Sequence, residues 1–115
     1  MRNFRDLDVW RKAHELVQAV YLATMRLPKE EIFGLTVQLR RAGTSVATRI
    51  AEGCGFDSDV EFAGYLQRSK AAASELEYLI LLAKDLGYLL EDEFVRLSDD
   101  TIVVKKMLSG FVRRI

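Results

Sequence analysis

The sequence has one cysteine, one proline and one histidine, and it contains no long hydrophobic run. The single cysteine, Cys54, excludes an intramolecular disulfide, so we expect a reducing compartment such as the cytoplasm. The longest apolar run, residues 78–83, is far shorter than the about 20 residues that cross a bilayer. The first six residues also lack the apolar region of a secretory signal. We therefore predict a cytoplasmic protein that is not inserted in a membrane.

An excess of charge of one sign is also absent, because 17 lysines and arginines balance 17 acidic residues. This balance argues against a surface built as a whole to attract nucleic acid or an anionic membrane. The charges are nevertheless uneven along the chain. Residues 91–100 contain five acids and one base, whereas residues 105–114 contain four bases and no acid. We therefore expect a basic C-terminal end.

The single histidine, His14, restricts the chemistry that the chain can perform. A di-iron site in a helical bundle requires Glu-x-x-His motifs on two helices, but Arg11 stands three residues before His14. Nucleophilic catalysis requires a base near a serine, cysteine or threonine, and Cys54 is expected in a loop, away from the helix of His14. We expect His14 to be exposed or at a boundary. We predict no catalytic residue, no metal site, no cofactor and no small-molecule substrate.

The sequence is rich in apolar residues at helical spacing, and 50% of its residues are hydrophobic. One domain over residues 1–115 is predicted, with helices at about residues 6–26, 30–52, 58–87 and 90–113, the second of which begins at either Glu30 or Leu35. Gly53-Cys54-Gly55 is expected to end the second helix, and Ser58 with Glu61 has the form of a capping box that starts the third. Short connections favour an all-α fold, an up-down-up-down antiparallel four-helix bundle.

Each predicted helix has an apolar stripe that we expect to face the core. The stripes are Trp10, Ala13, Val17, Val20 and Thr24; Leu35, Leu39, Ala42, Val46 and Ile50; Phe62, Leu66, Ser69, Ala73, Leu76, Ile80 and Ala83; and Leu90, Phe94, Leu97, Thr101, Val104, Leu108 and Phe111.

A polar stripe runs beside the apolar one on the second helix, because Gln38, Arg41, Ser45, Thr48 and Glu52 also recur at three- and four-residue steps. Two interpretations are open: an ordinary solvated face, or a surface that pairs with another copy of the chain. A further hypothesis concerns the hairpin of the second and third helices. There Arg40 or Arg41 is expected to pair with Glu75 and so define the register.

Seven basic residues are candidates for contact with phosphates. Three lie on the second helix, where residues 35–51 contain no acid, and four lie near the C-terminus. They are Arg40, Arg41, Arg49, Lys105, Lys106, Arg113 and Arg114. Together these residues could form a basic patch, and a symmetric assembly would multiply its contacts.

Four segments of the chain resemble a known family. They are residues 4–13 (FRDLDVWRKA), 35–42 (LTVQLRRA), 50–53 (IAEG) and 75–77 (ELE). Their order and spacing resemble those of the four-helix-bundle proteins encoded in 23S rRNA intervening sequences. The family-typical polar positions are Gln38, Arg41, Ser45, Glu52 and Glu75. The chain departs from the family pattern at Arg49, where asparagine is usual, near Phe56, where a base is usual, and at Ala71-Ala72, where Gly-Ser is usual.

The resemblance implies a fold and an assembly. Family members are similar to the accessory variability determinant of diversity-generating retroelements. This similarity implies a ring-like homo-oligomer, a pentamer, whose basic surfaces are expected to contact RNA, DNA or a reverse transcriptase. We therefore predict a non-enzymatic, oligomeric bundle that binds nucleic acid or a nucleic-acid enzyme. The alternative is a structural or protein-adaptor module that binds no nucleic acid and uses its basic residues in ion pairs between subunits.

Overall fold

The computed structural model describes residues 1–115 and confirms an all-α four-helix bundle. Two short 3₁₀ helices accompany the four long helices. In chain order the elements are η1 (Phe4–Asp6), α1 (Asp8–Thr24), η2 (Lys29–Glu31), α2 (Leu35–Cys54), α3 (Asp59–Asp85) and α4 (Glu91–Arg114).

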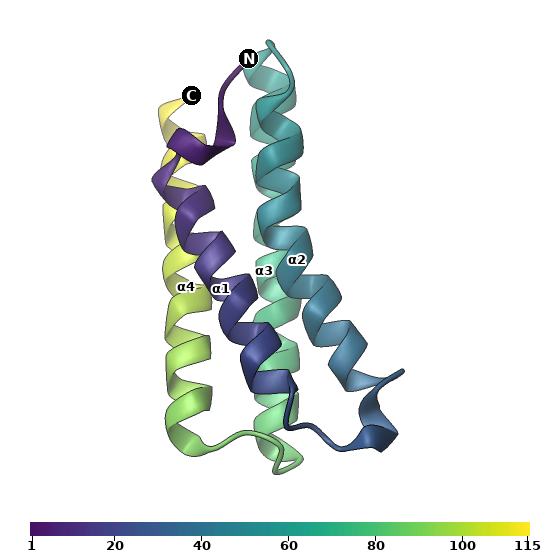
Figure 1. Cartoon of the computed structure of the whole chain (residues 1–115). Coiled ribbons are helices and arrows are strands. Elements are labelled where there is room, and N and C mark those ends of the chain that lie inside the picture. Colours follow the sequence, from purple (N-terminus) through teal and green to yellow (C-terminus); the bar gives the residue numbers. More distant parts are fainter.

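Consecutive helices run antiparallel, and the two termini lie at the same end of the bundle (Figure 1). Helix α1 packs against α2 and α4, and α3 packs against the same two helices from the opposite corner. Helices α2 and α4 are therefore diagonal to each other and do not adjoin. The bundle is elongated, with principal extents of 43 × 23 × 19 Å. No helix combines the length and the apolar character needed to cross a membrane.

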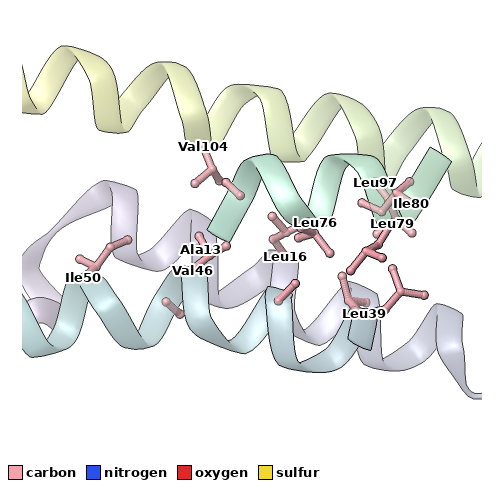
Figure 2. Close-up of a cluster of buried hydrophobic side chains, with 14 of the residues drawn as sticks. Ala13, Leu16, Leu39, Val46, Ile50, Leu76, Leu79, Ile80, Leu97 and Val104 are labelled. Atoms are coloured by element: carbon pink, nitrogen blue, oxygen red, sulfur yellow. The ribbon is translucent and has the colours of Figure 1, made fainter. Parts of the chain in front are cut away.

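The core contains side chains from all four helices (Figure 2). Every residue of the stripes predicted for α2 and α3 is buried. One of them is polar: Ser69 is fully buried, and its hydroxyl donates a hydrogen bond of 2.7 Å to the Val46 carbonyl oxygen, which links α3 to α2. The periodicity of these two helices was therefore sufficient to identify their buried faces.

The stripe predicted for α1 is partly wrong. Ala13, Val20 and Thr24 are buried as expected, but Trp10 and Val17 are only half-buried. The structure instead buries Val9, Leu16 and Ala23. Helix α1 touches both α2 and α4, so its buried face is centred between these two neighbours.

The stripe predicted for α4 is buried in its middle and less so at its ends. Leu97, Thr101, Val104 and Leu108 are buried, whereas Phe94 and Phe111 are half-buried. Leu90 is 58% exposed, because it precedes the first turn of α4 as its N-cap residue. Its assignment to the core was therefore wrong.

The connection between α1 and α2 is long, because α2 begins at the later of the two starts that the sequence left open. Helix α1 ends at Thr24, and α2 begins only at Leu35, with η2 between them. Pro28 precedes η2 in an extended conformation, with φ at −62° and ψ at 153°, which interrupts the helical backbone. The Glu31 carboxylate then accepts a hydrogen bond of 3.1 Å from the Leu35 amide at the start of α2.

The end of α2 also differs from the sequence-based expectation. Cys54 is the last residue of the helix and only 1% exposed, whereas the sequence suggested a loop. Its carbonyl accepts a hydrogen bond of 3.0 Å from the Arg2 amide, which attaches the N-terminal segment to this end of the bundle. The predicted N-cap of α3 is confirmed, because the Ser58 hydroxyl accepts a hydrogen bond of 3.3 Å from the Glu61 amide.

Candidate nucleic-acid interface

The seven candidate basic residues fall into two groups on different parts of the molecule. Arg40, Arg41 and Arg49 belong to α2, and the other four belong to α4. Because α2 and α4 are diagonal, a single chain does not unite the two groups in one patch. The expectation of one basic patch is therefore wrong for the monomer.

The α2 arginines have different surroundings. Arg40 is half-buried, its Nε donates a hydrogen bond of 2.9 Å to Thr24 Oγ1, and its guanidinium lies 4.6 Å from the centre of the Tyr21 ring. Arg40 thus joins α2 to α1. Arg49 forms an ion pair of 2.7 Å with Glu52 one turn later on the same helix. Arg41 is exposed and forms no ion pair or hydrogen bond.

The expected pairing of an arginine with Glu75 is not observed. Glu75 is exposed and takes part in no ion pair, and Arg40 points to α1 instead of α3. The polar stripe of α2 faces solvent in the single chain, because Gln38, Arg41, Thr48 and Glu52 are exposed and Ser45 is half-buried.

Three of the four C-terminal bases line a shallow groove between α3 and α4, with a volume of about 460 Å³. We call it the basic groove. Its lining consists of Lys70 and Glu77 from α3 and of Ile102, Lys105, Lys106, Ser109 and Arg113 from α4. Sequence reasoning did not include Lys70 in the candidate set. Lys70 and Glu77 are seven residues apart, about two helical turns, so they lie on one face of α3. This spacing was the signal in the sequence that could have identified Lys70.

The basic groove carries an excess of positive charge. Lys105 is paired with Glu77, and its Nζ lies 2.8 Å from the carboxylate. Lys70, Lys106 and Arg113 form no ion pair within the chain. Positive charges near one another in a concave surface attract anions such as phosphate groups. The groove therefore offers three free bases to an anionic ligand.

Arg114, the remaining candidate, lies on another side of α4. It lines a second groove, toward the start of α1, together with Asp6 and Asp8. Its guanidinium lies 5.7 Å from the centre of the Phe111 ring. The two acids make this side less favourable for a phosphate, although Lys106 borders both grooves.

The surface between α3 and α4 continues beyond the basic groove. Toward the start of α4 there is a hollow of about 330 Å³, lined by Ser74, Glu77, Tyr78, Leu81, Phe94 and Ser98. We call it the aromatic groove. Glu77 lines both grooves, so the two hollows are adjacent along the same helix pair.

The residues considered for catalysis do not line these grooves. His14 is exposed on α1, where its ring stacks on Trp10 at a centroid distance of 4.9 Å and an interplanar angle of 10°. Burial raises the pKa of the Cys54 thiol above its ordinary value, although the nearby positive charge of Arg2 acts in the opposite direction. This thiol is therefore protonated at neutral pH, which disfavours its use as a nucleophile. No three or more His, Cys, Asp or Glu side chains form a cluster that could hold a metal ion.

Fold and surface together define a small all-α bundle with a groove lined by basic residues between its last two helices. The model of the 23S rRNA-intervening sequence protein family matches residues 5–110, and the chain belongs to this family. It is also similar to a protein of unknown function from the S23 ribosomal protein family of Bacteroides thetaiotaomicron. That crystal structure shares 25% sequence identity with a TM-score of 0.81, over 90% of this chain and 97% of the other. No curated relative matches the chain.

Proposed function

We propose that this protein is a non-enzymatic, self-associating bundle of the cytoplasm that binds nucleic acid through the basic groove. The observation that carries the proposal is the presence of Lys70, Lys106 and Arg113 in one groove without an acidic partner. The family name refers to 23S rRNA, which makes RNA the first nucleic acid to test.

The interaction proposed for the basic groove is electrostatic. Lysine ammonium and arginine guanidinium groups donate charge-assisted hydrogen bonds to phosphate oxygens. Binding also releases the counterions condensed on the nucleic acid, so affinity depends steeply on salt. The Glu77 carboxylate orients Lys105 at the edge of the groove and leaves the three other bases free.

Self-association compensates for the small number of contacts in one chain. Three free bases give weak binding by themselves, because each phosphate contact adds only a small electrostatic increment. A homopentamer would present five copies of the groove to one nucleic acid and so increase the avidity. The exposed polar stripe of α2 is our candidate contact between copies, since neither of the proposed grooves uses it.

The test is RNA binding measured by fluorescence anisotropy over a range of salt concentrations. We expect the double variant Lys106→Gln/Arg113→Gln to bind RNA more weakly, with a log–log salt slope shallower by roughly 1.4–1.8 if each base contacts one phosphate. The matched control is Lys29→Gln/Arg96→Gln, which removes the same charge from exposed residues that line neither groove and lie outside the polar stripe of α2. Equal weakening by both double variants, or no RNA binding by the native protein, would contradict the proposal.

The adaptor function is the second candidate, and exposed apolar side chains near the α1–α2 connection favour it. Phe33 is 95% exposed, Met25 71% and Leu22 66%. Large exposed apolar side chains in one region are typical of surfaces that contact another protein. Of the seven candidate basic residues, Arg49 and Lys105 form ion pairs within the chain. In this alternative the other five would pair with acids of neighbouring subunits. An adaptor would show no salt-dependent RNA binding in the anisotropy experiment.

A further inference from the structure

We propose that the α3–α4 surface prefers single-stranded to double-stranded nucleic acid, with a base stacked on Tyr78 and the adjoining phosphates in the basic groove. This inference rests on the proposed function and names the form of nucleic acid that the same surface binds. Three observations carry it: the continuity of the two grooves, the unoccupied ring of Tyr78, and the separation of aromatic and basic residues along the surface.

The two grooves form one track along the helix pair. The aromatic groove is lined by α3 residues 74–81 and α4 residues 94–98, and the basic groove by α3 residues 70–77 and α4 residues 102–113. Because a helix rises about 1.5 Å per residue, Phe94 and Arg113 are roughly 28 Å apart along α4. A track of this length can accommodate several consecutive nucleotides.

Tyr78 is distinguished from the other tyrosines by its lack of a partner. The Arg40 guanidinium lies over the Tyr21 ring, and Tyr88 donates a hydrogen bond to Glu31. Tyr65 stacks on Phe56 at a centroid distance of 5.2 Å. Tyr78 is 59% exposed and has no hydrogen bond, aromatic contact or cation above its ring.

The neighbours of Tyr78 suit a nucleobase. Leu81 is 42% exposed and gives the hollow an apolar side. Phe94 forms the α4 side, and the Lys84 ammonium lies 4.5 Å from the centre of its ring. A hollow with an exposed aromatic ring, an apolar side and a cation nearby favours a flat, aromatic ligand carried on an anionic backbone.

The separation of aromatic and basic residues explains the preference for a single strand. Bases inside a duplex are already stacked and paired, so they cannot lie on the Tyr78 ring unless the duplex opens. Single strands present unstacked bases, which proteins bind by stacking on aromatic side chains next to basic grooves. A duplex could contact only the basic end of the track.

The experiment compares two labelled probes: an unstructured RNA of about 20 nucleotides and a duplex of the same strand with its complement. We expect the native protein to bind the single strand more tightly. Tyr78→Leu is expected to lower single-strand affinity by roughly 5- to 150-fold, which corresponds to the loss of one stacked base, and to leave duplex affinity unchanged. The matched control Tyr78→Phe keeps the ring and should keep the preference. Circular dichroism melting verifies that each variant is folded.

The outcomes separate this inference from the proposed function. Equal affinity for both probes, with both weakened by Lys106→Gln/Arg113→Gln, would retain nucleic-acid binding and overturn the single-strand preference. The preference would also be overturned if Tyr78→Leu weakened both probes equally, or if Tyr78→Phe behaved like Tyr78→Leu. A native protein that binds neither probe would overturn the proposed function together with this inference.

Discussion

Neighbouring residues on one helix have different roles because each residue turns the helix by about 100°. Arg40 lies on the side of α2 that faces α1, where it contacts Thr24 and Tyr21. Arg41 follows it in the sequence and is exposed to solvent. Replacement of Arg40 would therefore remove packing and a hydrogen bond, whereas replacement of Arg41 would remove no hydrogen bond or ion pair within the chain.

Tyr88 connects the two turns at the end of the bundle opposite the termini. From this contact we predict how the stability of the fold depends on pH. Its hydroxyl donates a hydrogen bond of 2.9 Å to Glu31, and this bond is the main reason that the pKa of Tyr88 is raised above its ordinary value of 10. Burial and the negative charges of Glu31 and Glu30 act in the same direction. The protonated phenol thus stabilises the folded state.

The contribution of Tyr88 is fully present below about pH 10 and is lost as the pH rises through the raised pKa of the folded state. We therefore expect the melting temperature of the native protein to fall more steeply above pH 10 than that of Tyr88→Phe. Thermal unfolding followed by circular dichroism at several pH values measures this difference. Parallel pH profiles for the two proteins would show that the hydrogen bond does not affect stability.

Helices α2 and α3 pack closely where α2 ends, at Gly53. A Cβ atom at Gly53 would lie 2.8 Å from Tyr65 Cβ and 3.2 Å from Phe62 Cδ1. Gly53 is therefore needed because a side chain would separate the ends of the two helices, and not because the turn requires its flexibility. A Cβ atom at Gly64, on α3, would have no neighbouring atom within 4 Å.

These two glycines give a matched pair of substitutions. We expect Gly53→Ala to lower the free energy of unfolding by about 1–3 kcal/mol, because the added methyl group overfills the helix contact. Gly64→Ala should raise it by about 0.5–1 kcal/mol, because alanine favours a helix and reduces the entropy of the unfolded chain. Urea denaturation of both variants measures these changes. Stabilisation by Gly53→Ala would contradict the close packing of α2 on α3.

At the scale of the whole molecule, the diagonal placement of α2 and α4 separates the bases of one chain into two surfaces. The basic groove lies between α3 and α4, while Arg41 and the rest of the polar stripe lie on α2. One surface can therefore bind a ligand while the other contacts a second copy of the chain. This arrangement is compatible with the ring that the family resemblance implies.

The mass of the protein in solution tests the ring. The chain has a mass of 13.1 kDa, so a homopentamer has a mass of 5 × 13.1 = 65.5 kDa. We expect light scattering on a sizing column, in moderate salt and with reductant, to give a value near that of the pentamer. A mass near that of the single chain would exclude the ring and favour a monomeric adaptor.

Much of the fold could be predicted from the sequence because helix periodicity is a local property. The four helices, the buried faces of α2 and α3 and the N-cap at Ser58 follow from residue spacing within single segments. The sequence left two starts open for α2, Glu30 and Leu35, because residues 29–34 also contain helix-forming residues. The backbone around Pro28 and Gly34 shows that the helix begins at Leu35.

The candidate site was only partly predictable, because it depends on which helices are neighbours. Residue spacing and charge were sufficient to predict a bundle of four helices with a basic end on α4. The packing of the helices was needed to show that Lys70 joins Lys106 and Arg113, and that the α2 arginines do not. The physical reason is that helical spacing defines the faces of each helix, whereas the packing of several helices around one core decides which faces meet.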